Sequence, residues 1–209
     1  MKQNHNKLDI LINNAAQTIH RPNEFYNSLI GNSIFTSDFP DRVDENGIQV
    51  DMRSKNTWVQ KISETPNSEL LAVTLINYIA PFILIRDLSP LFKNNDNTFI
   101  VNVSSMEGKY TTGNYAKTDR HVHNNCAKAS LNMLTRSLAF SWKQDNIYVN
   151  SVETGWITDE FPEPTKWKSF LPPLDEIDRA SRVLDPIFDH DSNNPKYGLF
   201  LKDYYRTQW

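Results

Sequence analysis

Short apolar runs alternate with longer segments of helical character along this chain, and this alternation limits the folds open to it. LDILINN (8–14), TFIVNVSS (98–105) and IYVNSVETG (147–155) are apolar through their middles and end in polar residues or glycine. Runs of this length and composition are typical of strands that are buried on both faces of a parallel sheet. GLFLKDY (198–204) is a weaker fourth candidate.

Three segments between and after these runs predict helices. Residues 68–92 are apolar over most of their length, and Pro81 is expected to kink that helix. Residues 123–143 carry apolar side chains at three- and four-residue steps, and residues 175–188 are amphipathic up to Pro186, where the helix is expected to stop. The order of strands and helices predicts an α/β fold of Rossmann type with a mostly parallel sheet.

Two long polar stretches interrupt this order. Residues 17–67 are rich in Asn, Asp and Ser, and residues 107–124 separate the second strand from the next helix. Both follow the carboxyl ends of predicted strands, the edge at which open α/β sheets place their ligand sites. We expect a single domain over 1–209, with 17–67 as an inserted lid over that edge.

Charge and cysteine content exclude several classes of protein. The net charge is −3, so no basic field favours nucleic acid or an anionic membrane surface. The single cysteine, Cys126, excludes an internal disulfide framework and is typical of a reducing compartment. The sequence shows neither a signal peptide nor an uninterrupted apolar stretch of membrane-spanning length. We therefore expect a cytoplasmic protein without a membrane span.

Five motifs occur in a fixed order, each at the end of a predicted strand or within a predicted helix. They are NNAA (13–16), Asn77, VNVSS (101–105), AKASLNMLT (127–135) and NSVETGWITDE (150–160). Together they resemble the short-chain dehydrogenase/reductase family from its fourth strand onward. The chain is most similar to an atypical group of that family, which lacks the catalytic tyrosine.

This resemblance implies a catalytic set. Ser105 matches the serine that binds the substrate oxygen, Lys128 the lysine that binds the nicotinamide ribose, and Asn77 the asparagine that holds a water for proton relay. Asn124 stands at the tyrosine position, four residues before Lys128. The residues also allow structural roles: Ser105 as a strand-end cap, Lys128 as a solvated lysine, and Asn77 as an amide bonded to backbone near Pro81.

The resemblance also implies contacts to NAD or NADP. Asn13, Asn14 and Ala15 match the loop that borders the adenine ribose. Lys128 matches the residue that binds the nicotinamide ribose, Gly155 belongs to a turn that can need a positive φ, and Thr158 matches the threonine that meets the nicotinamide amide. An alternative for Asn13 is that its side chain ties neighbouring strands together.

Two departures from the family pattern bear on activity. An amide such as Asn124 does not titrate, so any proton transfer needs another group, for which His121, seven residues before Lys128, is a candidate. His121 and His123 flank a valine, but no cluster of carboxylates or cysteines accompanies them, so no metal is expected.

The second departure is the glycine-rich turn that cradles a dinucleotide pyrophosphate, which this sequence does not contain: its first glycine is Gly31, within the insertion. The chain thus reads as a truncated family member, and we expect it alone to bind NAD or NADP weakly or not at all. Its first strand is expected to form an exposed edge that pairs with a second copy or a partner chain.

Two classes of function follow. One is an NAD(P)-dependent oxidoreductase that acts on a small-molecule carbonyl or alcohol. The other is a non-catalytic, dehydrogenase-like protein that binds or stabilises another subunit, or a fragment of a longer enzyme.

Overall fold

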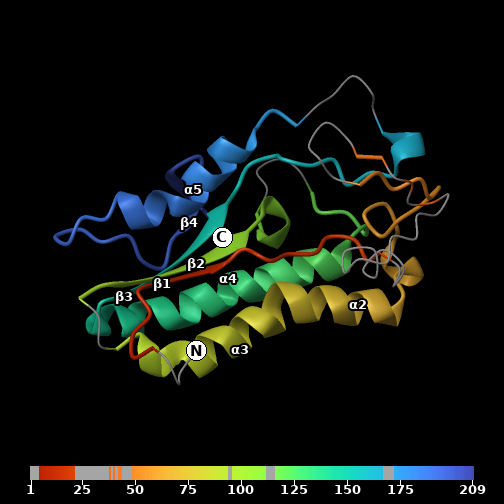
Figure 1. Ribbon diagram of the computed structural model, residues 1–209. Coiled ribbons are helices and arrows are strands. Elements are labelled where there is room, and N and C mark those ends of the chain that lie inside the picture. Colours follow the sequence, from red (N-terminus) through yellow and green to blue (C-terminus); the bar gives the residue numbers. More distant parts are fainter. Residues whose placement is uncertain are drawn as a thin grey trace.

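A computed structural model describes residues 5–21, 38, 40, 42–43, 49–93, 96–111, 116–166 and 172–209. Its centre is a sheet with the strand order β1-β2-β3-β4-β5 (Figure 1). The first four strands are parallel, and β5 pairs antiparallel with β4. The mostly parallel α/β sheet predicted from the sequence is confirmed. The strands are β1 (Ile10–Asn13), β2 (Thr98–Ser104), β3 (Ile147–Glu153), β4 (Phe200–Lys202) and β5 (Tyr205–Thr207).

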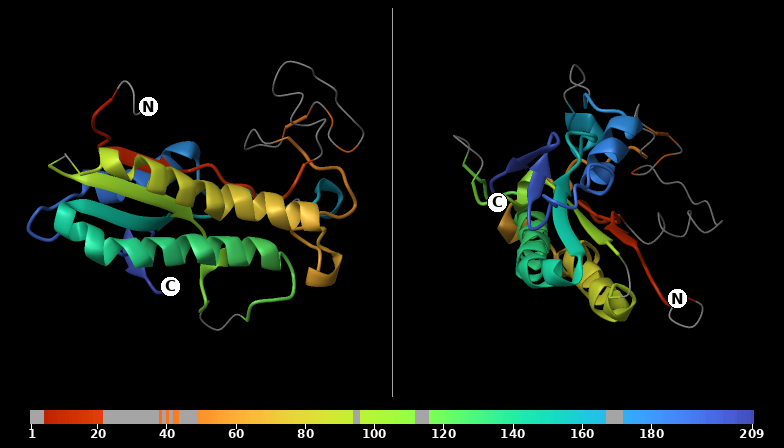
Figure 2. Two further views of the ribbon diagram at one scale, coloured as in Figure 1. Left: turned by 90° about the horizontal axis from the view of Figure 1, so that it is seen from below. Right: turned by 90° about the vertical axis from the view of Figure 1, so that its left-hand side faces the viewer.

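Helices cover both faces of this sheet. One face carries α4 and the long helix made of α2 and α3, and the other carries α5 (Figure 2). The helices are α2 (Asn67–Thr74), α3 (Ala80–Leu88), α4 (Val122–Trp142) and α5 (Glu176–Phe188). A π-helical turn, η2 (Leu75–Ile79), joins α2 to α3, and the 3-10 turns are η1 (Ile62–Glu64), η3 (Ser89–Leu91), η4 (Met106–Gly108), η5 (Lys143–Asp145) and η6 (Glu163–Thr165).

The helical prolines differ from expectation. Pro81 lacks an N–H, and its ring crowds the carbonyl four residues earlier. The backbone widens into η2 just before it, and the N–H of Ala80 donates to the carbonyl of Leu75, five residues back. The helix therefore continues through Pro81 by a π turn. Pro186 also lies inside its helix, because α5 runs on to Phe188.

The interior consists of two apolar clusters, one on each face of the sheet. Ile100 and Val149 pack toward α4, where they meet Leu131. Val101, the residue after Ile100 in β2, and Val152, three residues after Val149 in β3, face α5. Successive strand residues point to opposite faces, so this alternation also fixes which face each residue at a strand end takes.

The helix from Asn67 to Leu91 is long and apolar enough to cross a membrane by length and composition, with a hydropathy of 1.8. The expected absence of such a stretch is wrong for this segment. Core helices of soluble proteins pass the same test, so one such helix is weak evidence for a membrane. Here the segment packs against α4 through α2.

Candidate active site

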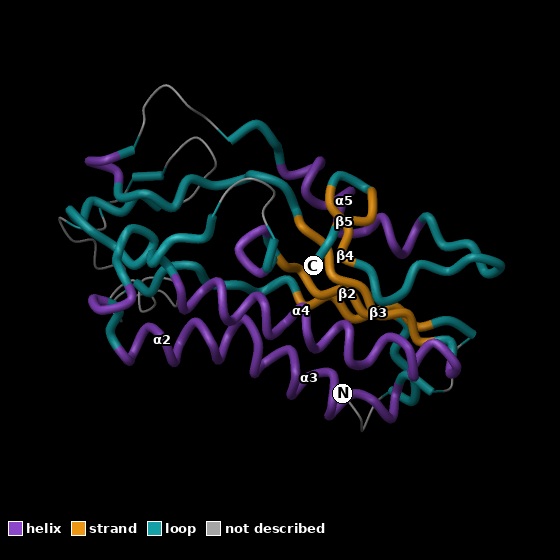
Figure 3. The backbone as a smooth tube through the Cα atoms, turned by 180° about the vertical axis from the view of Figure 1, so that it is seen from behind, coloured by secondary structure: helices purple, strands orange, loops and turns teal. Residues whose placement is uncertain are grey.

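A cavity of about 1230 Å³ opens at the carboxyl ends of the strands. The loops that leave β2 and β3 gather at this end of the molecule, beside the start of α4 (Figure 3). Residues from β1, β2, α4, α5 and the loop after β3 line it. Its described aromatic wall consists of Trp58, Trp156 and Phe161.

Two serines end β2 at the cavity. Ser104 is the last residue of the strand and Ser105 follows it, and both line the cavity. Their Oγ atoms are buried, and neither has a hydrogen-bond partner within the described part of the chain. Buried hydroxyls are normally paired, so these two point to a missing polar partner such as a ligand oxygen.

Lys128 lies on the second turn of α4 and is almost entirely buried. Its Nζ donates a hydrogen bond of 2.9 Å to the backbone carbonyl of Val103. Burial lowers the pKa of Lys128 to about 8, and the charge of Glu107 opposes that shift only in part. The site thus contains an ammonium group that titrates within about one unit of neutral pH.

Asn124 lies one turn before Lys128 on the same face of α4, and it also lines the cavity. Its Oδ1 accepts a hydrogen bond of 3.4 Å from Asn77 Nδ2. Asn77 itself does not line the cavity. Its Nδ2 also donates a hydrogen bond of 2.6 Å to the carbonyl of Gln17, and its Oδ1 accepts one of 2.9 Å from the N–H of Gln17. Asn77 thus holds the loop after β1 against η2.

The residues expected to contact a cofactor divide between the cavity and the core. Asn14 and Thr158 line the cavity, and Ala15 does not. Gly155 lines it with a φ of +86°, a backbone conformation that residues with a side chain rarely adopt. Gly155 is therefore needed for the backbone conformation of this turn.

Asn13 faces the core instead. Its Nδ2 donates to Asn102 Oδ1 at 2.7 Å, and Asn102 Nδ2 donates to Thr135 Oγ1 at 2.8 Å. Thr135 Oγ1 lies 2.8 Å from Ser151 Oγ, so the chain of polar contacts links β1, β2, α4 and β3. This arrangement matches the structural alternative for Asn13.

Comparison with known proteins decides the family. Residues 37–166 match the family model described as short chain dehydrogenase. The chain belongs to the short-chain dehydrogenase family. Among curated proteins it is similar to the uncharacterized protein R665 of Acanthamoeba polyphaga mimivirus, with 36% identity over 214 residues. That match covers 87% of this chain and 45% of the relative, so the chain spans less than half the relative's length.

Solved short-chain dehydrogenases share the fold. The NADPH-bound carbonyl reductase from chicken fatty liver superimposes with a TM-score of 0.59 at 18% identity, covering 99% of this chain and 68% of that one. The carbonyl reductase Sniffer of D. melanogaster gives a TM-score of 0.54 at 22% identity, covering 72% and 61%. At these identities the likeness shows the fold alone.

His121 does not face the cavity, contrary to the expectation from its spacing to Lys128. The helix begins only at Val122, and His121 is its N-cap with a φ of 38°. Its ring stacks on Trp58 with centroids 4.2 Å apart, and its Nδ1 donates to the carbonyl of Trp58 at 2.9 Å. The candidate substitute acid therefore does not line the cavity with Lys128, since the left-handed residue breaks the helical spacing.

Sequence reasoning missed Glu153 at the cavity, whereas it expected Trp58 of the insertion to pack against the body of the protein. Glu153 ends β3 and lines the cavity, and the signal for it was a carboxylate at the end of an apolar strand. Trp58 lines it from the insertion, and Asn56 nearby donates from Nδ2 to the carbonyl of Glu160 at 2.9 Å. The described end of the insertion thus touches the loop after β3. Most of residues 22–48 lie outside the described part of the chain.

The cavity fits the nicotinamide end of an NAD(P) cofactor. The unpartnered Ser105 Oγ and the Lys128 ammonium group lie on one wall, and Asn14 and Thr158 offer further polar groups. These four residues would hold the nicotinamide ribose, its amide and the reacting substrate oxygen. In the described residues, no group of three or more His, Cys, Asp or Glu side chains could hold a metal ion.

Proposed function

We propose that this chain forms the reactive half of an NAD(P)-dependent oxidoreductase that interconverts a small-molecule carbonyl and an alcohol. The observation that carries the proposal is the meeting of Ser105, Asn124 and Lys128 at one cavity, with the Ser105 hydroxyl unpartnered among the described residues. The family membership supports the reaction type. The other features expected of the protein, cytoplasmic location and no binding to nucleic acid or membrane, remain predictions.

Each residue has a distinct task in this proposal. A bound nicotinamide would supply or accept the hydride. Ser105 donates a hydrogen bond to the substrate oxygen, and the ammonium group of Lys128 stabilises the negative charge that develops there during reduction. Asn124 orients that oxygen through its amide without titrating. Asn77 positions Asn124 through their hydrogen bond rather than touching the substrate.

A non-catalytic role is the second candidate, and one observation favours it. The Asn124 amide and the Lys128 ammonium group already have hydrogen bonds within the chain, to Asn77 and to the carbonyl of Val103. Groups satisfied in this way can stabilise a fold without turning over a substrate. In that case the protein would bind or stabilise another subunit.

Nicotinamide absorbance, followed with a panel of aldehydes and ketones, separates the two candidates. With millimolar NADH or NADPH we expect carbonyl-dependent oxidation of the cofactor. Ser105→Ala should slow it about 100-fold, since one hydrogen-bond donor to a developing oxyanion contributes that much. Ser130→Ala, which removes a hydroxyl bonded only to the carbonyl of Cys126, is the control. A wild-type protein that oxidises no cofactor in the presence of any carbonyl would favour the non-catalytic candidate.

We also infer that β1 pairs with a second copy or a partner chain. In the described part of the molecule β1 pairs with β2 alone, and Ile10 is 43% exposed. A parallel edge of this kind invites pairing. Light scattering on the purified chain should show a species larger than 24.2 kDa. An Ile10→Lys variant should shift that species toward the monomer, and a monomeric wild-type chain would rule out self-pairing.

The insertion is proposed to act as a lid. Its described end reaches the cavity through Trp58, and the N–H of Glu163 donates to the carbonyl of Asp51 at 2.8 Å. Brief proteolysis should cleave within 41–53 before it cleaves any strand. First cleavage within 123–143 would argue against a lid.

A further inference from the structure

Glu153 is a buried acid beside the two serines of the cavity. It is the last residue of β3, and its Cα is in register with that of Ser104 on the neighbouring parallel strand. Side chains in register on adjacent strands share a face and lie about 5 Å apart. Glu153 and Ser104 are 6% and 3% exposed, and both line the cavity.

The two oxygens of this carboxyl group differ in their hydrogen bonding. The backbone N–H of Gly155 bonds to the carboxylate, whereas Oε2 has no hydrogen-bond partner within the described residues. Lys202 Nζ forms a long ion pair of 3.7 Å with Oε2 and also pairs with Asp203 at 2.7 Å. Ser104 Oγ likewise has no hydrogen-bond partner among the described residues, so two adjacent polar atoms at the cavity accept or donate no hydrogen bond there.

Charges of both signs surround Glu153. Lys202 favours its ionised form, whereas Asp203 and Glu107 disfavour it. The negative charge of Glu153 in turn favours the charged forms of Lys109 and Arg182. Burial is the largest influence, and it raises the pKa of Glu153 above the usual value for a glutamate. The group therefore holds a proton at a higher pH than an exposed glutamate does.

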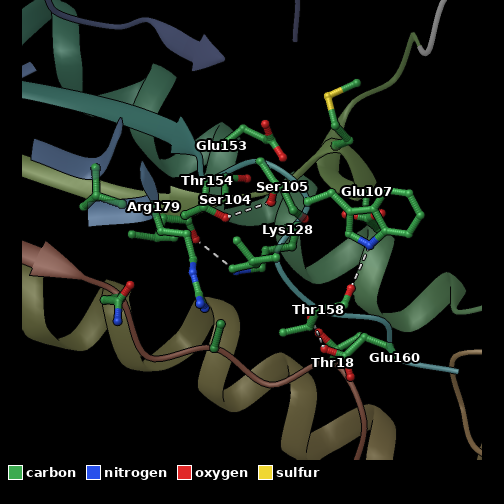
Figure 4. A pocket seen from close by; sticks show the side chains of 18 of the residues that line it. Thr18, Ser104, Ser105, Glu107, Lys128, Glu153, Thr154, Thr158, Glu160 and Arg179 are labelled. Atoms are coloured by element: carbon green, nitrogen blue, oxygen red, sulfur yellow. Dashed lines mark hydrogen bonds between the residues drawn. The ribbon is translucent and has the colours of Figure 1, made fainter. Parts of the chain in front are cut away.

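Three other groups near the cavity are less suitable for proton transfer than Glu153. Asn124 does not titrate, and His121 is bonded to Trp58 and does not line the cavity. Glu160 is half-buried, and its Oε1 already accepts a hydrogen bond of 2.9 Å from Thr158 Oγ1. Figure 4 shows Glu153 close to Ser104 and Ser105, and Thr158 and Glu160 further away.

We propose that Glu153 exchanges a proton with the substrate oxygen, in the role left open by the missing tyrosine; this rests on the proposed oxidoreductase function. In carbonyl reduction, the carbonyl carbon gains the hydride from a reduced nicotinamide, and the π electrons of the C=O bond move to oxygen. That oxygen takes the proton from the carboxyl group of Glu153. The products are the alcohol, the oxidised nicotinamide and a Glu153 carboxylate, which water reprotonates. Ser104 and Ser105 hydrogen-bond the oxygen.

Glu153→Gln tests this role because it keeps the shape and removes the exchangeable proton. With 4-nitrobenzaldehyde and millimolar NADPH, we expect the variant to lose about 100-fold in rate, the contribution of a general acid. The wild-type rate should fall as pH rises through the pKa of Glu153, and the variant should lack that fall. Glu69→Gln, which alters a buried carboxylate away from the cavity, should stay within threefold of wild type.

A second readout needs no cofactor. Because the folded state holds the Glu153 proton more tightly than the unfolded chain, the wild-type free energy of unfolding decreases as pH rises above 4.5. It decreases until pH passes the raised pKa. Glu153→Gln should remove this decrease, and Glu69→Gln should keep it.

The outcomes separate the two proposals. A wild-type protein that reduces no carbonyl overturns the oxidoreductase function and this role with it. An active wild type with an equally active Glu153→Gln overturns the proton-transfer role alone. If Glu153→Gln does not fold, Glu153→Asp decides: a folded Asp variant that keeps at least a tenth of the rate, with its fall at high pH, supports the role. A folded Asp variant whose rate does not depend on pH overturns it.

Discussion

The two ends of β2 and β3 differ in what they bury. Toward their amino ends, Ile100 and Val149 pack against Leu131 of α4. At their carboxyl ends, the same strands bury Ser104 and Glu153, each with an oxygen that has no hydrogen-bond partner among the described residues. Apolar burial stabilises the fold, whereas unpaired buried polar groups cost it about 1–3 kcal/mol each. The comparison shows that buried polar side chains join the apolar packing at the carboxyl end of these strands, where the cavity lies.

The helix α4 repeats this contrast along its length. Its first turns bring Asn124 and Lys128 to the cavity, and its later turns bring Leu131 and Leu134 to the core. Substitutions in the two halves should therefore have effects of opposite sign on stability.

Leu131→Ala should have the largest effect. Leu131 is 1% exposed, and truncating a leucine in a packed core costs about 3 kcal/mol of unfolding free energy. Chemical denaturation measures this loss. Met133→Ala, on the exposed side of the same helix, should change the free energy by less than about 0.5 kcal/mol. Equal losses in both variants would contradict the assignment of the core face.

Lys128→Met should stabilise the protein at pH 7. The folded-state pKa of about 8, against 10.5 for the ordinary group, means that burying the ammonium form costs about 3 kcal/mol as an upper limit. The unfolded chain binds more protons between these two pH values, so the wild-type free energy of unfolding rises with pH across them. The advantage of Lys128→Met should shrink over the same range. A less stable Met variant at pH 7 would show that the bond to Val103 outweighs the desolvation cost.

Cofactor binding by the 209-residue chain alone should give the smallest signal. The cavity offers groups for the nicotinamide end, and the sequence contains no glycine-rich turn for the pyrophosphate. Titration with NADPH, followed by nicotinamide fluorescence, should give a dissociation constant well above the low micromolar range. A constant near 1 µM, worth about 8 kcal/mol, would contradict this expectation.

The sequence predicted most of the fold because local patterns determine it. The apolar runs identify β1 to β4, and the spacing of Leu131 and Leu134 identifies the inner face of α4. Their order is enough to place Ser105 and Lys128 at the same sheet edge. The strand β5 was missed, because three residues after a tight turn carry no strand periodicity.

The details of the site depend on features that sequence spacing does not report. His121 was misplaced because its left-handed backbone ends the helical register. The continuation of the helix through Pro81 depends on a π turn, which has no simple sequence signature. Glu153 was overlooked because its burial and its open oxygen arise from the packing of three separate elements around it. Asn13 could be assigned to the core only once its bond to Asn102 was seen.

The most direct test of the account is carbonyl reduction by Asn124→Tyr. A tyrosine hydroxyl one helical turn from the Lys128 ammonium group regains a strong, titratable proton donor at the cavity. With millimolar NADPH, we expect the rate of 4-nitrobenzaldehyde reduction to rise about tenfold or more. Asn124→Phe, which has the ring without the hydroxyl, should show no rise, and adding Lys128→Ala to Asn124→Tyr should abolish it. If neither the wild-type protein nor Asn124→Tyr reduces the aldehyde while NADPH binds to both, the cavity is not a reductase site and the non-catalytic function replaces the enzymatic one.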